Sequence, residues 1–393
     1  MLNKKTVRDV DVNNKKVLVR CDFNVPLDVN DKSLITNDKR IIESMKTINY
    51  LVENGAKVIL CSHIGKHKEM LSLAPVAKRL SELLGKEVPL LVDVIGENVK
   101  AEIDKMVTGD VVLLDNVRKF KEEEENDENF SEELASLAEI YVNDAFGTAH
   151  RAHASTVGVT KHLPAYAGFL IEKELDALDK GINSPKRPLV AIIGGAKVSS
   201  KISVLTELLN KVDTLLIGGG MAFTFIKAQG GKIGTSLCEE DRLEEALGIL
   251  NKAKGKNVKV LITQDVYAAD DYSNDANKIL AKSDDIPDGY MGLDIGPKTL
   301  EAFGEEVSKA GTVVWNGPVG VAEFSNFANG TNSIAKLLAD SSAISIIGGG
   351  DSAAAVIKAG YEDKMNHIST GGGASLEFME GKILPGIAAL LDK

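Results

Sequence analysis

Short runs of aliphatic and β-branched residues recur along the chain, and each has the length of a buried strand. These runs are Lys16–Arg20, Lys57–Cys61, Val111–Asp115, Leu189–Ile193, Thr214–Ile217, Val258–Ile262, Thr312–Trp315 and Ala343–Ile347. Between them, stretches such as Leu73–Leu84 and Val198–Leu209 carry apolar residues three and four apart, which predicts helices. The alternation predicts an α/β fold with parallel sheets covered by helices on both faces. Ligands of such sheets bind where the strands end, so the residues after each strand are the functional candidates.

A boundary is predicted within Phe169–Pro188. A charged amphipathic helix over Phe169–Lys180 is followed by Gly181, Pro185 and Pro188, which end the helix and redirect the chain. The 393 residues exceed one ordinary core, since a domain has roughly 150 residues. We therefore expect two lobes.

Composition narrows the possible partners. A formal net charge of -11 disfavours a nucleic-acid or anionic-membrane binder, because such proteins carry a basic surface. The 3 cysteines are widely spaced and predict neither disulfides nor a zinc knuckle, which fits a reducing cytosol. The N-terminal segment lacks the apolar core of a signal peptide, and no run approaches the roughly 18 apolar residues of a membrane span.

Glycine clusters follow the strands of the second half. They are Gly194-Gly195, Gly218–Gly220, Gly317–Gly320, Gly348–Gly350 and Gly371–Gly373. Glycine lets the backbone approach a ligand closely, and helix N-termini then present free N–H groups to phosphate. The clusters predict nucleotide binding, although each alone is an ordinary tight turn.

Sequence motifs exclude some classes of nucleotide-binding site but do not select a single one. Neither a Walker A motif nor the catalytic HRD of protein kinases is present. Gly348–Ala353 fits the loose dinucleotide pattern G-x-G-x-x-[GA], so a dehydrogenase is the rival, but the acidic ribose clamp expected after the next strand is missing. A non-catalytic binding module is a second alternative, which would keep the glycines and lack the charges.

Two lysines and an aspartate accompany the glycines. Lys197 and Lys201 are four apart at the start of a predicted helix, where a cation is unfavourable unless an anion binds there. We interpret them as a phosphate-binding pair; two solvated lysines are the alternative. Asp351 is a candidate for Mg²⁺ on nucleotide phosphates or for a helix N-cap.

In the first half, polar and basic residues follow successive strands. Asp22 and Asn24 close the first strand on one side, because strand side chains alternate. The residues that follow later strands are His63, Lys66, Arg118 and Arg151, and Arg40 joins them as a further cation. Together they predict an anion pocket for phosphate and carboxylate, although each singly is more often a surface charge. His63 and His67 have zinc-ligand spacing but lack a second ligand pair.

These strings resemble the phosphoglycerate kinase family along essentially the whole chain. The matching segments are Cys21–Pro26, Asp144–Thr156, Gly194–Ile202, Gly218–Phe225, Met291–Pro297, Trp315–Val321, Gly348–Ser352 and Ser369–Glu377. The resemblance implies two Rossmann-like lobes: residues 1–170 for the glycerate substrate, a hinge helix and linker at 171–187, and 188–379 for the nucleotide. It also implies that the tail, 380–393, packs back on the first lobe.

The resemblance further implies reversible transfer of the 1-phosphoryl group of 1,3-bisphosphoglycerate to MgADP, giving 3-phosphoglycerate and ATP. Direct in-line transfer after lobe closure, in a cytoplasmic monomer, is the expected mode. By similarity, the glycerate substrate is held by Asp22, Phe23, Asn24, Arg40, His63, Ile64, Gly65, Lys66, Arg118 and Arg151. The nucleotide is held by Gly195, Ala196, Lys197, Lys201, Gly218, Gly219, Gly292, Gly317, Glu323, Gly349, Gly350, Asp351 and Ser352, with Asp351 nearest Mg²⁺. Arg40 and Lys197 are the candidates for neutralising the transferring group, helped by the N–H groups of Gly350 and Gly371–Gly373.

Three positions depart from the family pattern. Lys66 replaces an arginine of many members, so a bidentate phosphate contact becomes a point charge. Lys119 interrupts the usual NVRF string beside Arg118, and Ser200 stands where some members carry an aspartate near the metal. The departures at Lys119 and Ser200 leave the conformation of the loop around Arg118 and the presence of a second protein contact to the metal undecided at the level of sequence.

Overall fold

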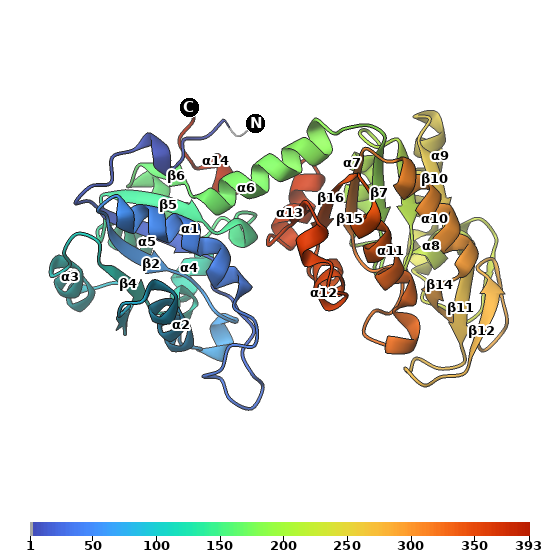
Figure 1. Ribbon diagram of the computed structural model, residues 1–393, viewed down its shortest axis with the longest axis horizontal. Helices are drawn as coiled ribbons and strands as arrows, with labels where there is room; N and C mark the ends of the chain where they lie inside the picture. The colour runs from blue at the N-terminus through green and yellow to red at the C-terminus, as the bar shows by residue number, and fades with distance from the viewer. Residues whose placement is uncertain (1–2) are drawn as a thin grey trace. The chain divides into compact units, whose positions relative to one another are not determined.

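The computed structural model describes residues 3–393, which divide into two compact units (Figure 1). Unit 1 comprises residues up to Asp176 together with Ile383–Lys393, and unit 2 comprises Ala177–Lys382. Within residues 3–393, each unit is built on a six-stranded parallel sheet with flanking helices, which confirms the predicted fold class.

The sheet of unit 1 has the strand order β3-β4-β2-β1-β5-β6. Its strands are β1 (Lys16–Cys21), β2 (Lys57–Cys61), β3 (Leu90–Leu91), β4 (Val111–Leu114), β5 (Ile140–Asp144) and β6 (Ala165–Ala167). The helices of this unit are α1 (Lys39–Glu53), α2 (Ala74–Leu84), α3 (Glu97–Asp104), α4 (Lys121–Glu125), α5 (Glu128–Ala135) and α14 (Pro385–Ala388). The chain leaves β1 toward β2 on one side, whereas β5 pairs on the other side, so the strand order reverses between β1 and β5.

Both ends of the described chain belong to unit 1, and they lie beside β6 (Figure 1). The amide of Lys5 donates to the Leu391 carbonyl over 2.8 Å, and the amide of Leu391 donates to the Ala165 carbonyl over 3.0 Å. Lys4 pairs with Asp392 at 2.8 Å. The last segment is therefore an integral part of unit 1 and not an appendage.

The main sheet of unit 2 has the order β10-β8-β7-β15-β16-β17. Its strands are β7 (Leu189–Ile193), β8 (Thr214–Ile217), β10 (Lys259–Ile262), β15 (Thr312–Asn316), β16 (Ile344–Gly348) and β17 (His367–Ile368). The helices are α7 (Ile202–Leu208), α8 (Ala222–Ala228), α9 (Leu243–Gly255), α10 (Pro297–Lys309), α11 (Asn329–Asp340), α12 (Gly350–Lys358) and α13 (Gly373–Met379). Here the order reverses between β7 and β15.

Unit 2 also contains smaller sheets that the sequence did not predict. Strands β11 (Asp265–Ala269), β12 (Lys278–Lys282) and β14 (Met291–Ile295) form an antiparallel sheet, and β9 (Lys232–Ile233) pairs with β13 (Asp285–Ile286). The chain passes from unit 1 to unit 2 through α6 (Phe169–Leu178), which continues as a π-helical turn, Asp179–Asn183. In the part of the chain described, no helix is long and apolar enough to cross a membrane.

Candidate active site

In unit 1, loops that follow different strands meet at the carboxyl edge of the sheet. Asn24, after β1, accepts a hydrogen bond at Oδ1 from the amide of Gly65, after β2, over 2.9 Å. Arg118, after β4, donates from Nη1 to the Gly65 carbonyl over 2.8 Å. Arg40, in the first turn of α1, donates from Nη1 to both carboxylate oxygens of Asp22 at 3.0 Å. The structure thus brings these five predicted residues into one network.

Arg118 is buried with part of its guanidinium unpaired. Its residue is 5% exposed, and its Nε and Nη2 atoms are buried without a hydrogen-bond partner. Glu124 Oε1 lies 3.5 Å from Nε, an ion-pair distance without hydrogen-bond geometry. Burial, followed by the charges of Arg151 and Arg20, lowers the pKa of Arg118. Because buried N–H groups without a hydrogen-bond partner are costly, Nε and Nη2 are suited to an anion that arrives from outside.

His63 lies in the field of several arginines. It is 2% exposed, and burial moves its pKa well below the ordinary histidine value, helped by the charges of Arg20, Arg118, Arg40 and Arg151. The imidazole is therefore neutral near pH 7. Arginine charge gathers here in a chain whose net charge is -11, so the field is local.

The other predicted substrate residues occupy different settings. The side chains of Phe23 and Ile64 lie in the hydrophobic core, so only their backbone is available to a ligand. Lys66 and Arg151 are exposed. Arg151 Nε donates to His150 Nε2 over 3.2 Å.

Asn116 is an organising residue that the sequence did not single out as a site residue. Its Oδ1 accepts from the amides of Arg118 at 3.0 Å and Ile64 at 3.2 Å, and its Nδ2 donates to the Ile64 and Leu71 carbonyls. It is fully buried and lies just after β4. A polar residue between a buried strand and an arginine was the available signal.

In unit 2, the glycine clusters gather at the carboxyl edge of the main sheet. Gly219 has φ +70°, and a Cβ there would lie 2.8 Å from Gly195 and Pro318 backbone atoms. Only glycine fits this close approach of the loops after β7, β8 and β15. Two adjoining cavities open at this edge and share Gly195, Ala196, Pro318 and Asp351 in their walls.

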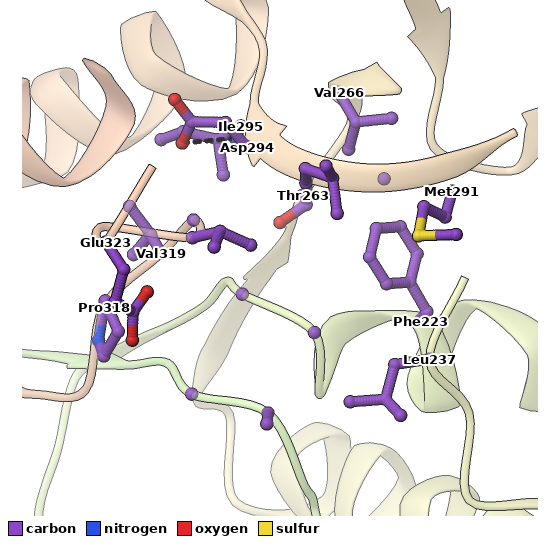
Figure 2. A pocket seen from close by; sticks show the side chains of 18 of the residues that line it. Phe223, Leu237, Thr263, Val266, Met291, Asp294, Ile295, Pro318, Val319 and Glu323 are labelled. Carbon is purple, nitrogen blue, oxygen red and sulfur yellow. Dashed lines mark hydrogen bonds between the residues drawn. The ribbon is translucent and has the colours of Figure 1, made fainter. Parts of the chain in front are cut away.

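The first cavity, of about 220 Å³, has a mainly apolar lining (Figure 2). Phe223, Leu237 and Met291 form one wall, and Glu323 lies by Pro318 and Val319 on another. Gly292 fits because a Cβ would come within 2.1 Å of the Phe223 ring. The cavity offers flat apolar contacts with two exposed carboxylates, Glu323 and Asp351, at its margin, which suits a base and its ribose.

Asp294 is a buried carboxylate in the wall of the same cavity. Burial raises its pKa to about 7, against the opposing hydrogen bonds from backbone amides. Its Oδ2 accepts from Gly330 at 2.9 Å and its Oδ1 from Ile295 at 2.9 Å. The side chain therefore anchors the start of α11.

The second cavity, of about 370 Å³, is polar and glycine-lined. The first turn of α12 contributes Gly350, Asp351 and Ser352, and further walls come from Gly317, Gly349, Gly373 and Ser200. Lys201 lines it and donates from Nζ to Asn316 Oδ1. Burial lowers the pKa of Lys201, while Asp351 and Glu380 act in the opposite direction. A helix N-terminus beside a lysine suits phosphate.

Two local predictions were wrong. The helix predicted from Val198 begins at Ile202, so Lys197 lies in the preceding loop and the lysines do not share a helix face. Ser199 explains the delay, because its amide and hydroxyl both donate to Glu239 and hold the loop open. Likewise β1 ends at Cys21, so Asp22 and Asn24 gather through loop contacts and not through strand alternation.

Some of the residues predicted to bind the nucleotide do not line either cavity, and Ser352 directs its hydroxyl to the backbone of neighbouring loops. Lys197 is exposed and lines neither cavity, and Gly218 packs against Val319. Ser352 accepts from the Gly317 amide at 2.9 Å and donates to the Gly348 carbonyl at 2.6 Å. Its hydroxyl therefore ties two glycine loops together.

The residues near the second cavity fit a metal that is held chiefly by phosphate. Within residues 3–393, no group of three or more His, Cys, Asp and Glu side chains is placed to hold a metal ion. Asp351 is exposed and borders both cavities. Mg²⁺ on nucleotide phosphates needs only one or two protein carboxylates, so Asp351 suits it.

Comparison with known proteins decides the family. A family model described as Phosphoglycerate kinase matches residues 7–382. The chain belongs to the phosphoglycerate kinase family.

Relatives and solved structures agree with that assignment. Phosphoglycerate kinases of Clostridium botulinum (strain Hall) and Clostridium tetani are 59% and 58% identical, cover 100% of this chain, and are themselves covered over 99% and 98% of their lengths. The structure of phosphoglycerate kinase from Coxiella burnetii superposes with a TM-score of 0.89 at 43% identity, and that from Pyrococcus horikoshii OT3 with 0.82 at 34%. Each match covers 98% of both chains.

Proposed function

We propose that this protein transfers the 1-phosphoryl group of 1,3-bisphosphoglycerate to MgADP, and the reverse, as a phosphotransferase. Membership of the phosphoglycerate kinase family supports the reaction. The observation that carries the assignment of sites is the contrast between an arginine-rich edge in unit 1 and a glycine-rich edge in unit 2. The first suits a small polyanion, and the second suits a nucleotide.

The glycerate substrate is proposed to bind at the edge of unit 1. The unpaired N–H groups of Arg118 supply donors for its phosphate or carboxylate, and Arg40 is fixed beside them by Asp22. The exposed Arg151 and Lys66 add charge. The contacts among Asn24, Gly65 and Arg118 support a pocket formed before the substrate arrives.

The nucleotide is proposed to place its base in the apolar cavity and its phosphates in the polar one. Glu323 would accept hydrogen bonds from the ribose, and Lys201 with the first turn of α12 would contact phosphate. Bound Mg²⁺ would supply charge neutralisation on the phosphate oxygens. Asp351 is the residue proposed to hold it.

Transfer is proposed to be direct. Phosphoryl transfer depends on alignment and on neutralising the equatorial oxygens, so no covalent enzyme intermediate is required. Arg40 and Lys197 are proposed for that neutralisation, with the N–H groups of Gly350 and Gly371–Gly373. Because the two substrates are proposed to bind to different units, a closure of the units must bring them together and exclude water. Small-angle scattering that detects no compaction with both ligands bound would contradict this closure.

We also propose that the protein acts in the cytoplasm as a monomer. Its three cysteines are free thiols, and Cys21 and Cys61 are buried, which suits a reducing compartment. Sedimentation at several concentrations tests the monomer.

A coupled assay tests the proposed function. Purified protein, 3-phosphoglycerate and MgATP are combined with glyceraldehyde-3-phosphate dehydrogenase, and NADH loss is followed with each component omitted in turn. Loss that requires every component supports the proposal, whereas no loss from folded protein would contradict it. NAD with the protein alone serves as the control for a dehydrogenase.

A further inference from the structure

Arg20 is a fully buried arginine on β1, one residue before the strand ends. A guanidinium is tolerated away from water only when its N–H groups are paired. Its Nε donates to Ser155 Oγ over 2.7 Å, and its Nη1 donates to the Cys21 carbonyl. Its Nη2 lies 3.2 Å from His63 Nδ1. Each side-chain nitrogen of Arg20 therefore has a protein partner. One of these partners is His63, a predicted substrate residue.

Glu123 supplies the opposite charge. It is fully buried, and it accepts from the Ser155 amide at 2.8 Å and from Ser155 Oγ at 2.6 Å. Because the hydroxyl gives its hydrogen to Glu123, its lone pair is left for Arg20 Nε. Burial acts to raise the pKa of Glu123, but His153, Arg20 and Ser155 together lower it. Glu123 and Arg20 are thus a buried pair of opposite charges, and Ser155 connects them through its hydrogen bonds to both.

The contact with Arg20 fixes which nitrogen of His63 carries hydrogen. A guanidinium has donors and no acceptor, so Nδ1 must offer its lone pair. A neutral imidazole carries one hydrogen, so an imidazole without hydrogen on Nδ1 carries it on Nε2. Protonation of both nitrogens would break the contact, and the surrounding arginine charge opposes it.

We propose that Arg20 is a positioning residue: its bond to Nδ1 holds His63 in the neutral Nε2–H form, which donates a hydrogen bond to an anionic oxygen of the bound glycerate. Glu123, through Ser155, keeps Arg20 in that orientation. The identity of the anion rests on the proposed function, whereas the tautomer does not. In the other tautomer, His63 would present a lone pair to the anion and repel it.

His67 provides an internal control. Its Nδ1 lies 2.6 Å from the Arg118 carbonyl oxygen, which only accepts, so His67 must carry hydrogen on Nδ1. Imidazole ¹⁵N chemical shifts of the full chain without substrate, assigned with the His63→Gln and His67→Gln variants, should place hydrogen on Nε2 of His63 and on Nδ1 of His67. Hydrogen on Nδ1 of His63 would overturn the proposal, and this measurement needs no variant of Arg20.

A paired variant tests the positioning role. Arg20→Met with Glu123→Gln removes both charges together, so neither ion is left buried alone. The expected result is a mixture of His63 tautomers, an unchanged His67, and a KM for 3-phosphoglycerate raised about tenfold with the KM for MgATP unchanged. Arg20→Lys keeps the charge but cannot serve all three partners, so an intermediate KM is expected. An unchanged tautomer or acceptor KM in the paired variant would overturn the proposal.

The two proposals fail in different ways. If the protein lacks kinase activity, the proposed function is refuted, and inorganic phosphate then replaces the glycerate as the probe. A phosphate-dependent change in the His63 Nε2 shift that is lost in the paired variant would support the role of Arg20. A response that is absent, or equal in both proteins, would refute it.

Discussion

The amide of Gly65 donates a hydrogen bond to Asn24 Oδ1 over 2.9 Å and so joins the loop after β1 to the loop after β2. The Gly65 carbonyl in turn accepts a hydrogen bond from Arg118, which follows β4. The amide and the carbonyl of Gly65 thus connect the loops after β1, β2 and β4. The side chain of Asn24 therefore organises the proposed glycerate pocket before any ligand binds.

Asn24→Ala should loosen this pocket. We expect the KM for 3-phosphoglycerate to rise about tenfold, because the Gly65 amide loses its partner and the loop beside Arg118 is no longer fixed. The KM for MgATP should not change. Asn24→Asp keeps an acceptor and should be milder; equal effects of both substitutions would contradict this account. Steady-state kinetics with each substrate varied provides the measurement.

Arg118→Met should separate binding from stability. Removing a buried, partly unpaired cation should raise the free energy of unfolding of the unliganded protein by about 1 kcal/mol. Affinity for 3-phosphoglycerate should fall at least about tenfold. Urea unfolding and calorimetric titration measure the two quantities. A loss of stability without loss of affinity would show that Arg118 is structural.

Lys197→Ala should reduce kcat by roughly a hundredfold without unfolding the protein, because Lys197 is exposed and proposed to neutralise the transferring group. Lys254 on α9 is also exposed and lines neither cavity, so Lys254→Ala is the matched control. Turnover and circular dichroism are compared across the variants. Near-normal turnover of Lys197→Ala would exclude the proposed role.

Gly292→Ala should obstruct the cavity that is proposed to bind the nucleotide base. The added methyl would lie 2.1 Å from Phe223 Cζ, so the buried ring must move. We expect the KM for MgATP to rise about tenfold while the KM for 3-phosphoglycerate is retained. A Cβ added at Gly248 on α9 would have nothing within 4 Å, so Gly248→Ala should leave both KM values unchanged. A normal KM for MgATP in Gly292→Ala would place the base elsewhere.

Asp144→Asn should change how stability depends on pH. Burial raises the pKa of Asp144 to about 7, although bonds from Thr47 and the Leu170 and Ile171 amides oppose the shift. The unfolded value is about 3.9, so the favourable contribution of the protonated carboxyl is complete below that pH and is lost as pH rises through about 7. Relative to wild type, the variant should gain about 2 kcal/mol between pH 5 and pH 8. Urea unfolding at both pH values measures this, and a pH-independent difference would contradict it.

The main strands could be predicted because they are buried on both faces and read as continuous apolar runs. The small antiparallel sheet gave no such signal. β12 is exposed on alternate residues, and the pairing of β11 with β14 shifts register between Tyr267 and Ala268. The start of α7 could not be predicted, because the contacts of Ser199 with Glu239 that delay it involve a residue far along the chain.

The charged candidates were found because they follow strands, and parallel strands end at one edge. Arg20, Glu123 and Asn116 escaped because their importance lies in pairing. Arg20 and Ser155 are far apart in sequence, and nothing local in either segment indicates that they meet. Polar residues inside apolar runs acquire meaning only when their partners are known.

The return of residues 383–393 to unit 1 has a consequence for biosynthesis. The amide of Gly386 donates to the Ala149 carbonyl, and Asn143 on β5 donates to the Gly386 carbonyl. During translation, unit 2 can be finished while unit 1 still lacks these bonds, although unit 1 is made first. Residues 383–393 must therefore leave the ribosome before unit 1 can form all of its bonds, so unit 1 is completed only after unit 2 has been synthesised.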